Sequence, residues 1–283
     1  MSQVFASIDG SAAAPGVCDY AAWASQRLQA PLTLLHILDR TLYPQAGDLS
    51  GTIGLGSREH LLTELAALDQ QRSKVALEEG RIILQAAQSR VQEAGISEPM
   101  LRQRHGDLIA CLSELENEMR LLVIGRQGER SASTEHQVGG HLESVIRTLH
   151  KPILVAGDTF TAPQQIMLAF DGSATAHKSV EMLADSPLIK GLPCHLVMVG
   201  ADSHATREQL KTAQHRLLKT ASEVHLAIVA GEVEPALHAY QAEHNIDLLA
   251  MGAYGHSRIR QFFVGSTTTN LLRSSTSALL ILR

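Results

Sequence analysis

A segment rich in glycine and hydroxyl residues, 251–268, holds the residue types best suited to binding a phosphate group. It reads M-G-A-Y-G-H-S-R-I-R-Q-F-F-V-G-S-T-T and has the spacing Gly-x2-Gly-x9-Gly-Ser. Gly252 and Gly255 directly follow an apolar run, and residues without a β-carbon let the backbone approach a ligand closely. Residues 265–268 begin the last helical pattern, where unpaired N–H groups and the positive end of the helix dipole favour an anion. The segment therefore predicts a phosphate site.

An aspartate at the end of an apolar run is the second candidate binding group. Asp171 follows the run 166–170, and in a doubly wound sheet the carboxyl end of a strand borders the crevice where strand order reverses. A carboxylate there can accept hydrogen bonds from a ribose or from an adenine amine. The sequence Asp171-Gly172-Ser173 also suits the start of a helix, so a capping role is a second interpretation, compatible with the first.

The sequence lacks the motifs of fast enzymes. Neither the Gly-x4-Gly-Lys-Ser/Thr phosphate loop nor the Gly-x-Ser-x-Gly elbow of hydrolases occurs. The 14 histidines form no His-x3-His or Glu-x-x-His pair, so no metal site is expected. Cys18, Cys111 and Cys194 never form Cys-x-x-Cys, which favours a reducing cytoplasm over a disulfide framework. We therefore expect a binding protein without dedicated catalytic residues.

Composition narrows the class of protein further. With 24 Lys and Arg against 29 Asp and Glu, the formal net charge is −5, and no stretch of five or six like charges occurs, which argues against a nucleic-acid partner. The hydrophobic fraction of 45% with 19% charged residues is typical of a folded chain. No apolar run approaches the roughly 18 residues of a membrane span, and the first residues do not resemble a signal peptide. We expect a soluble, cytoplasmic protein.

The chain repeats itself, and the repeat supplies the elements that position these residues. Residues 4–12 read V-F-A-S-I-D-G-S-A and residues 166–174 read I-M-L-A-F-D-G-S-A. Residues 121–128 match 248–255 in the same order, and a short apolar run closes each half. This order predicts two domains of one type.

Each half alternates buried strands with helical patterns, which predicts a doubly wound α/β fold with a parallel sheet. Strands are expected at 4–8, 32–38, 100–104, 121–125, 152–156, 166–170, 194–199, 224–229, 247–252 and 278–282. First-half helices are expected at 12–28, 58–93, 107–119 and 141–149, with shorter counterparts in the second half. The predicted domains are 1–157 and 165–283, joined by a Gly- and Pro-containing boundary. A loop at 41–56 lengthens the first domain, with Ser57 as the expected N-cap of the following helix.

On these residues the chain resembles a tandem universal stress protein, with two domains of that family in one polypeptide. The resemblance covers essentially the whole chain and rests on Asp171-Gly-Ser, the Gly-x2-Gly-x9-Gly-Ser spacing and the terminal apolar strand. It implies five-stranded sheets of order 3-2-1-4-5, Rossmann-like in form, with ATP, alone or with Mg²⁺, in the crevice between strands one and four.

The resemblance also implies the residues that would hold the nucleotide. The adenine and ribose side would be formed by Ala169, Phe170 and Asp171, with Met198 touching the base. Ribose and phosphates would contact Met251, Gly252 and Gly255, and the phosphates would lie against Gly265, Ser266, Thr267 and Thr268.

The first half departs from this pattern. Gly140 and His141 stand where the second half has Ser266 and Thr267, and the preceding loop has one extra residue. Two hydroxyl donors are lost, and Glu129 and Glu135 bring negative charge toward a phosphate. We therefore expect nucleotide mainly in the second half.

The function expected from these observations is that of an ATP-binding regulatory module of the stress response. The alternatives are an interaction protein that binds no nucleotide and a slow ATP hydrolase or self-phosphorylating protein. The apolar edges 152–156 and 278–282 are expected to pair within one chain as a pseudo-dimer, because an unpaired apolar edge strand invites aggregation. Two such chains are candidates for a homodimer.

Overall fold

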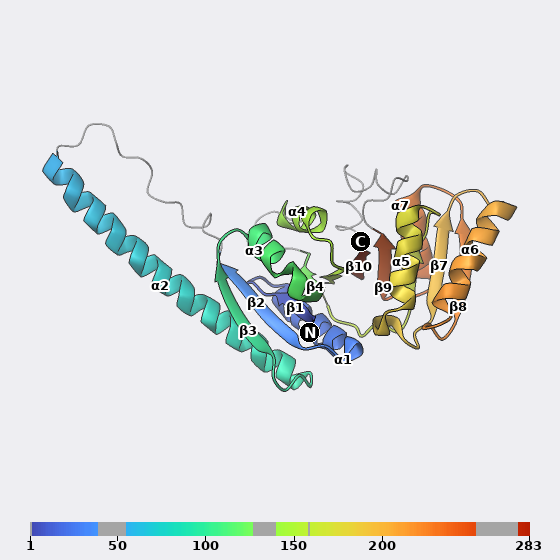
Figure 1. Cartoon of the computed structure of the whole chain (residues 1–283), viewed down its shortest axis with the longest axis horizontal. Helices are drawn as coiled ribbons and strands as arrows, with labels where there is room; N and C mark the ends of the chain where they lie inside the picture. The colour runs from blue at the N-terminus through green and yellow to red at the C-terminus, as the bar shows by residue number, and fades with distance from the viewer. Residues whose placement is uncertain (1, 39–54, 127–139, 158, 253–276) are drawn as a thin grey trace.

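A computed structural model describes residues 2–38, 55–126, 140–157, 159–252 and 277–283 of the chain (Figure 1). Its strands form one ten-stranded sheet of order β3-β2-β1-β4-β5-β10-β9-β6-β7-β8. The first half contributes β1 (Gln3–Ser7), β2 (Leu32–Leu38), β3 (Met100–His105), β4 (Met119–Gly125) and β5 (Ile153–Ala156). The second half contributes β6 (Ile166–Ala169), β7 (Cys194–Val199), β8 (Val224–Val229), β9 (Leu248–Gly252) and β10 (Ala278–Leu282). Each half thus has the expected strand order 3-2-1-4-5.

Helices cover both faces of this sheet. The first half has α1 (Ala14–Leu28), α2 (Leu55–Glu93), α3 (Leu108–Leu115), the 3-10 turn η2 (Glu116–Glu118) and α4 (Gly140–Thr148). The second half has α5 (Ala174–Ala184), the 3-10 turn η4 (Pro187–Ile189), α6 (His204–Leu217) and α7 (Val233–Glu243). One core layer joins the sheet to α1, α2, α5 and α6, and a second joins it to α3, α4 and α7. Covering both faces explains why strands such as β6 are apolar at every position.

The two halves meet through an antiparallel pair of edge strands. Leu279, Leu280 and Ile281 of β10 lie opposite Val155, Leu154 and Ile153 of β5. This confirms the predicted pairing of 152–156 with 278–282 inside one chain. Arg126 spans the same seam, since its Nη2 donates to the carbonyl of Ser277 over 2.7 Å. Because all other strand pairs are parallel, the strands of the two halves run in opposite directions.

The long helix α2 has 39 residues and extends well beyond the sheet (Figure 1). Its C-terminal part packs through a buried stripe that includes Ala76, Leu84 and Val91. The prediction that Ser57 caps this helix is wrong, because the helix begins at Leu55 and Ser57 lies inside its first turn. Most of the predicted loop 41–56 lies outside the described residues. No helix in the described part of the chain combines the length and apolar character needed to cross a membrane.

Candidate functional site

Three neighbouring strands bring the described candidate residues of the second half to one edge of the sheet. Ala169, the last residue of β6, lies opposite Met251 on β9 and Val197 on β7. The N–H of Phe170 donates to the carbonyl of Val197 over 2.9 Å, which extends the ladder by one residue. β6 lies between β7 and β9, so this edge is the point at which the strand order reverses and ligands of doubly wound sheets bind.

The turn after β6 is built around the carboxylate of Asp171. Its Oδ1 accepts a hydrogen bond from the N–H of Ser173 over 3.0 Å, and Ser173 Oγ in turn accepts from the N–H of Ala176 over 3.1 Å. Ser173 is therefore the N-cap of α5, which confirms the capping interpretation of Asp171-Gly-Ser. Within the described chain Asp171 Oδ2 has no hydrogen-bond partner, so this oxygen can accept from a ligand.

A glutamine on α6 closes over this turn. Gly172 has a φ of +72°, and a β-carbon there would lie 2.7 Å from Oε1 of Gln209. A residue with a side chain at position 172 would thus have an unfavourable backbone conformation and would also clash with Gln209. Gln209 places a second polar group beside Asp171, and no sequence pattern distinguishes this exposed glutamine from the other polar residues of its helix.

Gly252, at the end of β9, allows a helix to approach the sheet closely. A β-carbon on Gly252 would lie 2.9 Å from Ser179 Oγ and 3.1 Å from Thr175 Cγ2, both on α5. The absence of a side chain is therefore required by helix–strand packing, as for one of the glycines in dinucleotide-binding folds. The same packing aligns the start of α5 with the end of β9.

The four apolar candidates at this edge have buried side chains that divide between the two faces of the sheet. Phe170 and Met198 are 2% and 5% exposed and belong to the core layer under α5 and α6. Ala169 and Met251 belong to the opposite layer, with α7. The Phe170 ring packs edge-on against His177 with centroids 5.1 Å apart. A ligand would therefore meet these residues mainly through their main chain.

The remaining candidates, Gly255, Gly265, Ser266, Thr267 and Thr268, lie outside the described residues. The repeat nevertheless offers a comparison within the chain. α4 of the first half begins at Gly140, the residue that aligns with Ser266. The expected start of the last helix at 265–268 lies outside the described residues and stays a prediction.

The first half repeats the turn with different surroundings. Asp9 Oδ1 accepts from the N–H of Ser11 over 3.1 Å, as Asp171 does from Ser173. Directly after β4, however, the first half has Arg126, which is buried and committed to the seam through Ser277. Glu129 and Glu135 lie outside the described residues. The first-half edge thus keeps the acidic turn, whereas the arginine that follows β4 reaches toward β10.

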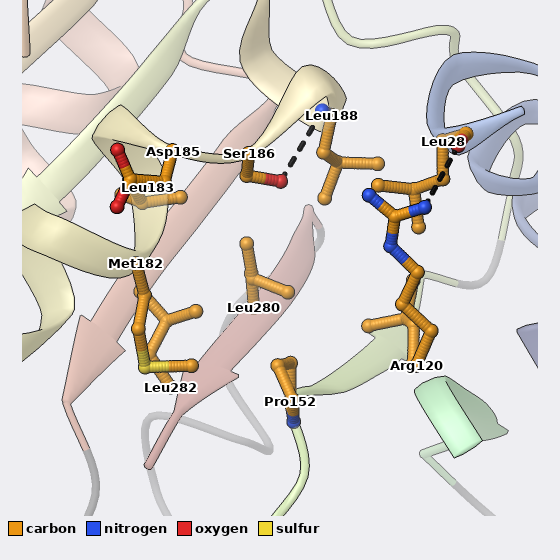
Figure 2. Close-up of a pocket in the computed structure, with 11 residues that line it drawn as sticks. Leu28, Arg120, Pro152, Met182, Leu183, Asp185, Ser186, Leu188, Leu280 and Leu282 are labelled. Atoms are coloured by element: carbon orange, nitrogen blue, oxygen red, sulfur yellow. Dashed lines mark hydrogen bonds between the residues drawn. The ribbon is translucent and has the colours of Figure 1, made fainter. Parts of the chain in front are cut away.

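A pocket of about 220 Å³ lies elsewhere, between the C-terminal ends of α1 and α5 at the seam (Figure 2). Its wall is mainly apolar and includes Leu280 and Met182. Arg120 lines it, but its Nη1 already donates to the carbonyl of Leu28 over 3.0 Å (Figure 2). The pocket is smaller than the roughly 300–1,000 Å³ of ordinary ligand sites and contains none of the predicted binding residues.

A histidine network lies on the α7 face near the start of β7. Nδ1 of His195 is 2.9 Å from the Tyr240 hydroxyl, and its Nε2 is 3.2 Å from Gln165 Oε1. Burial, and then the neighbouring His225 and His244, lower the pKa of His195. Sequence spacing could not reveal this network, because its members come from four separate segments. Among the described residues, no group of His, Cys, Asp and Glu is arranged to hold a metal ion.

The chain forms two doubly wound five-stranded units that are joined edge to edge, and each unit has an Asp-Gly-Ser turn after its first strand. These features define a tandem α/β protein of the Rossmann-like class. The chain belongs to the universal stress protein family, because the profile described as "Universal stress protein family" matches residues 2–157 and 163–283. The "Universal stress protein Slr1230" of Synechocystis sp. is 33% identical over 287 residues, and the match covers 100% of both chains.

Solved structures extend the comparison to the fold. A universal stress protein from Archaeoglobus fulgidus DSM 4304 has a TM-score of 0.69 at 17% identity, over 99% of this chain and 96% of that one. A functionally unknown protein from Pseudomonas aeruginosa PAO1 has a TM-score of 0.60 at 15% identity, over 100% of this chain and 92% of that one. The arrangement of both halves is therefore shared with other proteins of this architecture.

Proposed function

We propose that this universal stress protein is a regulatory module that binds an adenine nucleotide, ATP, mainly in its second half. The observation that carries the proposal is Asp171 at the reversal point of the second-half sheet, with Oδ2 open to a ligand and the backbone of Gly252 at the end of the neighbouring strand β9. Ligands of doubly wound sheets bind outside the carboxyl ends of the strands at such a point.

The proposed roles follow from the chemistry of each group. Asp171 Oδ2 accepts from the ribose or from the adenine amine, and the amide of Gln209 adds a polar contact beside it. The phosphates are assigned to the hydroxyls and N–H groups of residues 265–268, with Gly255 leaving room for them. Mg²⁺, where present, would neutralise phosphate charge.

The two domains then differ in role. Domain 165–283 holds the nucleotide, whereas domain 1–157 stabilises domain 165–283 through the pairing of β5 with β10. Binding changes the behaviour of the protein by favouring the conformation, or the partner, for which the bound form has the higher affinity. Cys18, Cys111 and Cys194 are free and buried, which supports a reducing cytoplasm as the compartment.

The first test asks whether the purified protein carries or binds nucleotide. The full chain is denatured, and the released small molecules are analysed by mass spectrometry, followed by calorimetric titration of the nucleotide-free protein with ATP. We expect adenine nucleotide in the supernatant or saturable binding of ATP. The absence of both would overturn the proposal and leave the interaction-protein alternative.

The second test separates the binding role of Asp171 from its capping role. Asp171→Asn keeps an oxygen that can accept from Ser173 N–H but replaces the second acceptor by a donor. We expect ATP affinity to fall about tenfold, equivalent to about 1.4 kcal/mol. The matched control is Asp9→Asn in the equivalent first-half turn, which should leave affinity unchanged. Equal effects of the two substitutions would contradict the assignment to the second half.

A further inference from the structure

The helix α2 has two parts with different surroundings. Its C-terminal part is held against the sheet by Ala76, Gly80, Leu84, Ala87 and Val91, which are all buried. Of the side chains described between 63 and 75, none is buried. The N-terminal part is therefore an arm that extends past its own domain (Figure 1).

An apolar row follows the side of α2 that faces away from the sheet. Leu68, Val75 and Ile82 are 49%, 62% and 56% exposed. They recur every seven residues, close to two helical turns, and so lie one above the other. Single exposed apolar residues are ordinary, but three of them aligned on one side of a helix, with polar residues between them, suit a contact with another helix.

We propose that this row is a dimer interface, in which α2 of one chain pairs antiparallel with α2 of a second copy about a two-fold axis near Val75. Val75 then packs against the partner subunit's Val75, and Leu68 packs against the partner subunit's Ile82. The row is symmetric in spacing about Val75, so the same surface serves both chains, as a two-fold interface requires.

The charges beside the row favour a second copy in this orientation. Arg72 and Glu79 are exposed and lie on one flank of the row, on either side of Val75 along the helix. An antiparallel pair brings Arg72 beside the partner subunit's Glu79. The two-fold axis brings Glu79 beside the partner subunit's Arg72 in the same way, so the interface contains two pairs of opposite charge. A parallel pair would place like charges at the same level. The N-terminal arm of each α2 would then lie along the C-terminal part of the partner's α2, which is the part that packs against the sheet.

The proposed surface is separate from the nucleotide site, and the proposal does not rest on nucleotide binding. The first test is the mass of the full chain, measured by light scattering during size-exclusion chromatography over a range of concentrations. We expect twice the monomer mass of 30.6 kDa for the unmodified chain and the monomer mass for Val75→Glu. Circular dichroism checks that the variant is folded, which is expected because Val75 is exposed.

The control variant is Leu101→Glu, at an exposed leucine on the edge strand β3. It should remain a dimer. A monomer at every concentration, or a dimer that survives Val75→Glu, would overturn the proposal. Dissociation by Leu101→Glu alone would assign the interface to the β3 edge instead and would overturn it as well.

Cysteine cross-linking tests the orientation. Chains with Leu68→Cys and chains with Ile82→Cys are oxidised separately and as a mixture, and the native cysteines contribute little because they are buried. We expect covalent dimers to form about tenfold faster in the mixture than in either sample alone. Faster cross-linking of Leu68→Cys to itself would contradict the antiparallel arrangement.

Discussion

Leu280 of β10 lies opposite Leu154 of β5, in an antiparallel pair that joins the two halves of the chain. Both side chains are buried, so each half covers the edge strand of the other. Because the halves run in opposite directions through this pair, the strand-end turns of Asp9 and Asp171 lie at opposite edges of the common sheet. One ligand cannot contact both turns.

The seam should make a large contribution to stability. Leu154→Ala removes a fully buried side chain between the halves, and we expect the free energy of unfolding to fall by about 2–5 kcal/mol. Urea denaturation followed by circular dichroism measures this change. Leu226→Ala, at an exposed leucine of β8, is the control and should change stability by no more than about 0.5 kcal/mol. Similar losses in the two variants would contradict a packed seam.

Any side chain at position 252 should lower the stability of the protein. In Gly252→Ala the new methyl group would lie 2.9 Å from Ser179 Oγ, so α5 must shift or Ser179 must rotate. We expect a loss of about 1–3 kcal/mol in the free energy of unfolding. Adding Ser179→Ala removes the nearest atom and should recover part of the loss, measured as a double-mutant cycle. Independent, additive effects would show that the two residues do not meet.

The histidine network should make stability depend on pH. Gln165 Oε1 can only accept, so in the neutral ring Nε2 of His195 carries the proton and the Tyr240 hydroxyl donates to Nδ1. Burial, together with His225 and His244, holds the folded-state pKa of His195 below its ordinary value of 6.5. The unfolded chain therefore takes up this proton first, and stability should fall as pH decreases from about 6.5 toward the lowered pKa. The pKa of His238 is also lowered, by burial first, and it acts in the same direction.

Urea midpoints at several pH values between 7.5 and 5 would measure this dependence. His195→Gln removes the titrating ring but keeps polar groups beside Tyr240 and Gln165, so its stability should vary less with pH. The exposed residue His105, at the end of β3, supplies the control His105→Gln, which should leave the dependence nearly unchanged. An unchanged slope in His195→Gln would contradict the role of the network.

An ion pair between α1 and α2 should make a small contribution to stability that depends on salt concentration. Arg90 of α2 donates from Nε and Nη2 to the two carboxylate oxygens of Asp19 on α1, over 2.8 and 2.7 Å. Asp19 accordingly raises the pKa of Arg90. We expect Arg90→Ala to cost about 0.2–1 kcal/mol at low salt, and less at 1 M NaCl because the pair is partly exposed. A loss that does not depend on salt would assign the effect to packing of the arginine stem.

Much of this architecture could be predicted from local sequence. The apolar runs located all ten strands within a few residues, because a strand buried on both faces must be apolar at almost every position. The repeated Asp-Gly-Ser located both turns, since a short acidic side chain and a glycine are the residue types that such a turn requires. The pairing of the two terminal strands followed from the same logic, because both were apolar edges in need of cover.

Other features could be obtained only from the tertiary structure. Phe170 and Ala169 lie in the core layers on opposite sides of the sheet, and which helices form each layer depends on how distant segments pack. The same is true of Gln209 over Gly172 and of His195 beside Tyr240, whose members meet only after the chain has folded. Local sequence was enough to predict the elements, their order and the acidic turns, because these depend on neighbouring residues. The direction of the two halves, the reach of α2 beyond its sheet and the neighbours of each buried polar group emerge only on folding, because they depend on contacts between segments far apart in the chain.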